Sequence, residues 1–254
     1  MFILNNLKTN PNIEWSEKVG PFQICEYKQD RSVDVGMASQ EYYASKMNIR
    51  KRQVLCEIRK GQGIVLQAGA MQWMLGNVSA TTGVKGVGDF FGKMIGGSVT
   101  GEAGIKPEYE GEGMIMSEPT YRFLLLVDVS KWGSGIVLED GMFLACESCL
   151  QRKVISRRSL SSAVAGNEGL FNLCLSGQGT AVLESKYPYD ELIEVELQND
   201  VLKIDGSMAV AWSADLEFTV ERAGKSLLGS AASQEGLVNV FRGTGKVLMA
   251  PLAG

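Results

Sequence analysis

The sequence predicts an all-β fold with one or two short helices, in which repeated antiparallel units build a sandwich or barrel. Apolar and polar residues alternate almost without error from Leu192 to Val220, which is the period of a strand with one buried face. The segment that begins at Glu168 returns near the C-terminus, from Glu235, with nearly the same residues. Thirty glycines against six prolines suit a chain with many turns. These observations together predict a duplicated β architecture.

Composition narrows the functional classes. The chain has 254 residues, enough to bury a large core without disulfides or metals. Histidine is absent, which excludes Ser-His-Asp and Cys-His nucleophiles, histidine-ligated zinc and imidazole acid–base catalysis. A net charge of −4 disfavours nucleic acid as a partner. We therefore expect a non-enzymatic protein with no cofactor, no catalytic residue and no dedicated metal site.

The chain shows no membrane or secretion signal. Its N-terminal apolar run spans only Met1 to Leu4, too short for a signal peptide. The longest strongly apolar run, Phe123 to Val127, is far shorter than a membrane helix, which needs about 20 residues. Five cysteines cannot all pair within one chain, and such a sparse, odd set is typical of a reducing compartment. We expect a cytoplasmic protein.

Residues 1–50 differ in composition from the rest, and we expect them to form an extension that packs on the core. Short strands are predicted near Ile13 to Trp15 and Phe22 to Ile24, and a short helix from Ala38 to Lys51.

Residues 51–254 are predicted to form the repeated β core, with units of about 54–132, 133–198 and 199–254. A Gly-x-Gly followed by Ile-Val-Leu ends at Leu66 and again at Leu138, and a diverged third copy starts at Asp200. A second landmark is a Gly-x-Gly that leads into an apolar run, at Gly111, Gly177 and Gly243. Repeated glycines of this kind are best explained by turns or bulges that need positive φ or close backbone approach.

The first unit carries a Gly-rich insertion at residues 82–104. Within it, a short helix would place Phe90, Phe91, Met94 and Ile95 on one side, with glycines at both flanks. We expect a mobile helical lid that closes one end of the β core. A ligand lid and a membrane-touching loop are the alternatives.

Cys146-Glu-Ser-Cys149 is the motif with the strongest chemical associations, because a Cys-x-x-Cys can be redox-active or half of a zinc site. Redox use favours a helix N-terminus, and zinc needs two more ligands. The repeat aligns Cys146 with Trp212 and Cys149 with Asp215, along a strand. We expect two strand-borne thiols, with a functional pair as the alternative.

Two further motifs are assigned no function. The Gly-rich stretches do not have the spacing of nucleotide-binding motifs, and the basic cluster from Gln151 to Arg158 is interpreted as a solvated face.

The motifs in this order resemble the AIM24 family (altered inheritance of mitochondria 24, formerly DUF124). The resemblance covers about residues 51–254 and rests on Gly69-Ala-Met71 after a Gly-x-Gly strand, on Gly96-Gly97-Ser98 and on the closing segment Glu235 to Leu248. It implies a duplicated β architecture similar to the tryptophan RNA-binding attenuation protein (TRAP-like), prone to oligomerise. Fungal mitochondrial members are linked to inner-membrane organisation, and the family supplies no active site. The N-terminal extension, the Cys pair and the absence of a transit peptide depart from it and favour a bacterial, cytoplasmic origin.

Three hypotheses of function follow. The first is a homo-oligomeric interaction scaffold with a protein partner still to be identified. The second is a binding module for a small ligand or RNA between the stacked units. The third is a thiol redox or metal protein that uses Cys146 and Cys149.

Overall fold

The computed structural model describes residues 2–81, 106–156, 158–159, 171–205, 208–222 and 237–251 of the protein. The expected lid with Phe90, Phe91, Met94 and Ile95 lies outside these residues. The predicted all-β class is confirmed, since the regular secondary structure of the described residues is strand except for one short α-helix and short 3-10 turns.

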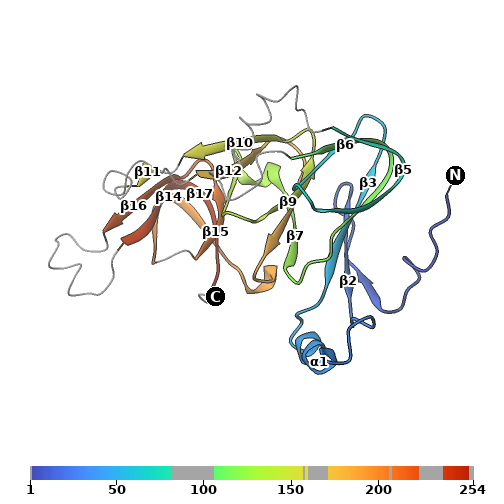
Figure 1. The fold of residues 1–254 in the computed structure, drawn as a ribbon. Helices are drawn as coiled ribbons and strands as arrows, with labels where there is room; N and C mark the ends of the chain where they lie inside the picture. The colour runs from blue at the N-terminus through green and yellow to red at the C-terminus, as the bar shows by residue number, and fades with distance from the viewer. Residues whose placement is uncertain are drawn as a thin grey trace, which may run out of the picture.

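Two curled sheets make up the body of the protein (Figure 1). The first sheet has the order β1-β2-β3-β6-β4-β9-β13-β7, with β5 paired to β6. Its strands are β1 (Ile13–Trp15), β2 (Phe22–Tyr27), β3 (Arg52–Ile58), β4 (Ile64–Leu66), β5 (Met71–Thr81), β6 (Glu108–Ser117), β7 (Phe123–Asp128), β9 (Phe143–Glu147) and β13 (Thr180–Ser185).

The second sheet has the order β10-β12-β8-β15-β17-β16-β11, with β14 paired to β17. Its strands are β8 (Ile136–Leu138), β10 (Gln151–Ser156), β11 (Arg158–Ser159), β12 (Phe171–Ser176), β14 (Ile193–Asp205), β15 (Ala209–Ser213), β16 (Glu217–Arg222) and β17 (Leu237–Met249). The described pairings are antiparallel except that of β11 with β16. The 3-10 turns η1 (Val129–Trp132) and η3 (Tyr189–Glu191) link strands.

The largest buried cluster lies where the two sheets meet. It contains Val65 and Cys146 from the first sheet and Ile136, Leu138 and Leu175 from the second. This interior is apolar packing throughout, which is the dominant favourable term in folding.

The same strand pairing recurs along the chain. β6 lies between β3 and β5, β13 lies between β7 and β9, and β17 is paired by β14 and β15. We call residues that occupy the same place in these patterns equivalent. The pattern supports the proposed boundaries of three units, which stay a prediction.

The glycine landmarks share a positive φ, and Gly111 also allows close strand contact. Gly111 has φ +126°, and a Cβ there would stand 2.0 Å from the Asn77 carbonyl oxygen of β5. Gly177 and Gly243, at the equivalent places, have φ of +116° and +119°. A side chain at Gly111 would therefore both strain the backbone and push β5 away from β6.

The N-terminal residues extend the first sheet. β1 pairs with β2, and β2 pairs with β3, which buries Ile13 and Cys25 against Leu55 and Met116. The helix α1 (Ala38–Lys46) is shorter than predicted. It ends early because Asn48 takes a left-handed φ of +59°, after which the chain turns into β3.

Candidate functional site

Two short strands dock on a neighbouring strand edge in the same way. In β4, residues Ile64, Val65 and Leu66 pair with Glu147, Cys146 and Ala145 of β9. In β8, residues Ile136, Val137 and Leu138 pair with Ser213, Trp212 and Ala211 of β15. Both docking strands read Ile-Val-Leu after a Gly-x-Gly.

The backbone hydrogen bonds that flank each docked strand also match. Gln67 N donates to Leu144 O at 2.7 Å, as Glu139 N donates to Val210 O at 3.1 Å. At the other end, Ser148 N donates to Gly63 O at 2.9 Å, as Ala214 N donates to Gly135 O at 2.8 Å. The contact of β4 with β9 and that of β8 with β15 therefore have the same register and the same flanking hydrogen bonds.

Docking buries the residues at the centre of each interface. Val65 and Cys146 are both 0% exposed and lie in the same core cluster. Val137 is 0% and Trp212 is 3% exposed, and both lie in a second buried cluster, within the second sheet. Each docked strand thus completes the core of the strands that receive it.

β5 is the equivalent of β9 and β15, the two strands that receive β4 and β8. Its pairing with β6 skips one residue at a bulge after Met71, as β9 skips one after Phe143 and β15 skips one after Ala209. This register makes Trp73, Met74 and Leu75 equivalent to Ala145, Cys146 and Glu147.

No strand covers this third edge within the described residues. β5 pairs with β6 alone, and Met74 is 45% exposed where its equivalents are 0% and 3% exposed. We call the outer edge of Trp73, Met74 and Leu75 the open edge. By equivalence with Ser148 and Ala214, the Gly76 amide points outward beside it.

The third copy of the docking strand, in β14, has a charged residue at its centre. Leu202, Lys203 and Ile204 of β14 take the place of Ile64, Val65 and Leu66, as their pairing with β17 shows. Lys203 is exposed where valine is buried in β4 and β8. A lysine on an edge strand opposes further pairing, so this end is protected while the open edge is not.

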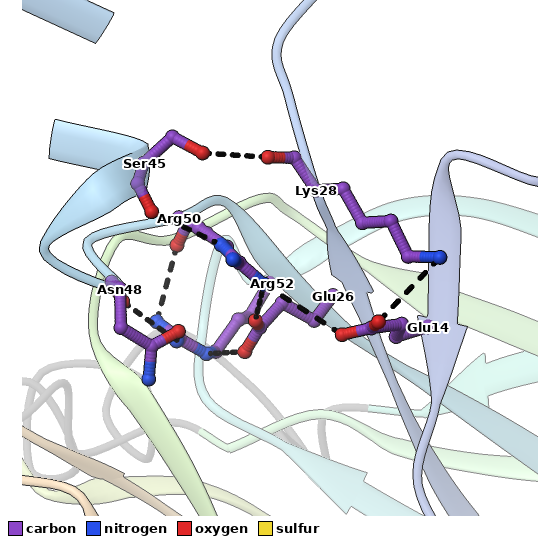
Figure 2. Close-up of polar contacts among 7 residues, drawn as sticks. All are labelled: Glu14, Glu26, Lys28, Ser45, Asn48, Arg50 and Arg52. Atoms are coloured by element: carbon purple, nitrogen blue, oxygen red, sulfur yellow. Dashed lines mark hydrogen bonds and ion pairs between the residues drawn. The ribbon is translucent and has the colours of Figure 1, made fainter. Parts of the chain in front are cut away.

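A charged cluster holds the N-terminal extension on β3 (Figure 2). The buried Arg52 donates from Nε to Glu26 Oε2 at 2.6 Å, and from its terminal nitrogens to Arg50 O at 3.2 Å and Asn48 O at 2.9 Å. Its guanidinium lies 4.2 Å from the centre of the Phe123 ring. Burial lowers the pKa of Arg52, and the Glu26 charge opposes that shift.

The rest of the cluster ties β1, β2 and α1 together. Arg50 Nη1 lies 2.9 Å from Glu26 and 3.6 Å from Glu14, and Lys28 Nζ lies 3.5 Å from Glu14. Ser45 of α1 donates to Lys28 O at 2.7 Å. Because these charges pair among themselves, we interpret the cluster as a structural brace.

Two shallow grooves border the brace. One of about 340 Å³ is lined by apolar and aromatic side chains, among them Ile24, Leu124 and Tyr189, and by polar ones that include Arg52 and Glu26. The other, of about 520 Å³, lies between α1 and the end of β2. Both are large enough for a small ligand.

The cysteine pair differs from the sequence expectation in one respect. Cys146 lies in β9 as expected, but Cys149 lies in the turn before β10, because the strand ends at Glu147. Burial raises the pKa of Cys146 to about 12. The pKa of Cys149 is raised by desolvation and by Glu147. Neither environment stabilises the thiolate that redox or metal chemistry needs.

The remaining sequence expectations concern metals and membranes. In the part of the chain that the structure describes, no group of three or more Cys, Asp or Glu residues is placed to hold a metal ion. The described helices include none that is long and apolar enough to cross a membrane.

Sequence reasoning missed the open edge and the brace. The repeated Gly-x-Gly-Ile-Val-Leu was a signal for the first, because two identical strands imply two similar receiving edges. The brace had no signal, since its charges are scattered between Glu14 and Arg52.

Comparison with known proteins identifies relatives across most of the chain. Residues 46–252 match the family model described as "Mitochondrial biogenesis AIM24". An uncharacterized protein of Streptococcus pyogenes serotype M6, M6_Spy0233, is 27% identical over 204 residues, which is 77% of this chain and 79% of the relative. The crystal structure of protein SPYM3_0169 from Streptococcus pyogenes matches with a TM-score of 0.58 and 25% identity, over 81% of this chain and 90% of that one.

Proposed function

Because the chain belongs to the AIM24 family, in which the streptococcal relative is itself uncharacterized, we propose that the protein is a non-enzymatic interaction scaffold that accepts a partner strand along the open edge. One observation carries the proposal: Met74 is 45% exposed, while both equivalent positions are buried under a docked strand. Addition of a strand to a sheet edge is a common mode of protein recognition. We place this activity in the bacterial cytoplasm.

The chemistry of the receiving edge defines the partner. Both docked strands of this chain present a β-branched valine opposite Cys146 or Trp212, with an aliphatic residue on each side. A partner strand should therefore be extended and apolar, with a β-branched residue opposite Met74. Main-chain hydrogen bonds would supply affinity, and the central side chain would supply selectivity.

The brace supports this activity indirectly. It fixes β1 and β2 on β3, and the extension in turn packs Leu7 and Trp15 in the cluster that contains Trp73. The extension therefore packs on the same cluster as the open edge and helps to order it before a partner binds, which lowers the entropic cost of binding.

A peptide from this chain tests the proposal. The probe is Gly-Gln-Gly-Ile-Val-Leu-Gln, residues 61–67, and the readout is hydrogen–deuterium exchange of the Gly76 amide. We expect protection of this amide at saturating peptide, or protection that is already present without peptide because a partner copy fills the edge. In either case, Met74→Lys should abolish protection, whereas Ser79→Lys on the same strand should not.

Ser79 is a matched control because it lies on the same strand beyond the register used by β4 and β8. A peptide with lysine in place of Val65 should give no protection. The proposal is wrong if Gly76 exchanges at an unprotected rate with and without the first peptide.

The apolar groove beside the brace favours a small-ligand module as the second candidate. Its aliphatic and aromatic lining suits a small apolar or amphipathic molecule. A thermal-shift screen checks it, with Tyr189→Lys as the groove variant, because Tyr189 lines the groove and is 56% exposed. A melting temperature that no compound raises would remove this candidate.

A further inference from the structure

The residues Phe2, Ile3 and Leu4 form an exposed apolar segment without a strand partner. They are 43%, 82% and 38% exposed and belong to no described strand. Isolated surface apolar residues are ordinary, but three in a row are unusual. Among its described residues the protein therefore has both an apolar segment and a strand edge that lack a strand partner.

The two features lie at the same end of the molecule. The N-terminus and β5 both lie at the end opposite β14 and β16 (Figure 1). Leu7 packs in the same cluster as Trp73 of the open edge. The exposed segment thus ends three residues before a residue that packs on the same cluster as the receiving strand.

The segment has the chemistry of the strands that dock elsewhere. Phe-Ile-Leu resembles Ile-Val-Leu, because both have a β-branched residue at the centre and an apolar residue on each side. Antiparallel docking in the same register would set Phe2 against Leu75, Ile3 against Met74 and Leu4 against Trp73. Ile3, the most exposed of the three, would take the place of the fully buried Val65 and Val137.

We propose that the open edge is filled by the Phe2 to Leu4 segment of a second copy, and that two copies exchange these segments to form a twofold dimer. This inference rests on the proposed function. A reciprocal exchange covers both open edges at once and gives a closed assembly. Head-to-tail pairing through β14 is disfavoured because it would bury Lys203 opposite Met74.

A second copy fits better than the segment of the same chain. Within one chain, Leu7 packs on the same cluster as Trp73, yet Ile3 is left 82% exposed and no described strand covers the open edge. Docking on a partner places the segment on an edge without a reversal between Leu4 and Leu7. The exchanged strands are short, so we expect a dimer that dissociates on dilution.

Sedimentation velocity of the full chain over a range of concentrations tests the dimer. Ile3→Lys and Met74→Lys should each raise the dimer dissociation constant at least tenfold. Asn5→Lys and Ser79→Lys add the same charge to the same two segments outside the proposed register, and both should leave the constant unchanged. All four positions are exposed, so the variants should fold.

A disulfide trap tests the register. In the ladder of β4 with β9, the flanking bonds make Val65 and Cys146 a hydrogen-bonded pair, so Ile64 and Glu147 form a closer, non-hydrogen-bonded pair. The equivalent pair here is Phe2 with Leu75. In a Cys149→Ser background, Phe2→Cys with Leu75→Cys should therefore cross-link two chains, and Phe2→Cys with Ser79→Cys should not.

The outcomes separate this inference from the proposed function. A dimer that Met74→Lys disrupts but Ile3→Lys does not would overturn the exchange and leave the scaffold standing. A disulfide within one chain, a strict monomer, or a mass that grows beyond the dimer would also overturn the exchange. A monomer whose Gly76 amide is not protected under any condition would refute both the segment exchange and the proposed scaffold.

Discussion

Arg52→Met tests whether the brace fixes the N-terminal extension to the core. Arg52 is 3% exposed and donates to one carboxylate and two carbonyl groups. Methionine keeps most of the packing over Phe123 but removes the charge and every donor. Losing one partner of a buried pair costs about 3–5 kcal/mol, and we take about 3 kcal/mol because Glu26 keeps its contact with Arg50.

Urea unfolding measures this cost, and Arg59→Met is the matched control. The Arg59 side chain is 71% exposed and lies 3.7 Å from Glu57, so its loss should change the unfolding free energy by less than about 0.5 kcal/mol. In thermal melts, Arg52→Met should lower Tm by about 6–12 °C. A double-mutant cycle with Glu26→Gln should show coupling, because both changes break the same ion pair. A loss below about 1 kcal/mol for Arg52→Met would refute the brace.

Three further predictions concern the strand interface, the glycine landmark and the thiols. Val137→Lys should cost more than about 3 kcal/mol in urea unfolding, because it buries an unpaired ammonium where the side chain is 0% exposed; a milder loss would contradict the packing of β8 on β15. Gly111→Ala should destabilise by about 3 kcal/mol, against about 1 kcal/mol for Gly61→Ala, whose Cβ would meet nothing within 4 Å; equal effects in the same assay would show that close strand approach is not the cause. At neutral pH, Cys149 should react with a thiol reagent far faster than Cys146, and mass spectrometry of the folded protein should find the label on Cys149; fast labelling of Cys146 would mean that the β9 edge opens. Because burial raises the pKa of Cys146 to about 12, above its ordinary 9.0, its contribution to stability is complete below pH 9 and is lost as pH rises toward 12; urea unfolding at several pH values should show a smaller decline for Cys146→Val than for the parent protein, in which the other buried thiols also contribute.

The thiol hypothesis and the scaffold hypothesis make opposite demands on Cys146. A redox or metal role needs an accessible thiolate, whereas the structure places this residue at the centre of the β4 contact, with no exposed surface. Its partner Cys149 is accessible but has a raised pKa. The structure therefore favours a packing role for Cys146.

Several features followed from the sequence alone. Alternating residues identified strands with one buried face, such as Ile193–Asp205, where Leu197 is buried between the exposed Glu196 and Gln198, and the absence of histidine excluded whole classes of catalysis. The Gly-x-Gly landmarks marked the places where the backbone takes a positive φ, at Gly111, Gly177 and Gly243. These features are local, because side-chain period and backbone φ are set within a few residues.

The tertiary structure alone decided which strand edges are paired. Met71–Thr81 and Phe143–Glu147 are both strands, yet among the described residues the outer edge of the first has no partner strand and that of the second is covered by β4. The hydrophobic pattern describes only the faces of a strand, whereas its edges are N–H and C=O groups that every residue other than proline carries. A sequence therefore shows where a strand is buried, but its edge partners depend on segments far away along the chain.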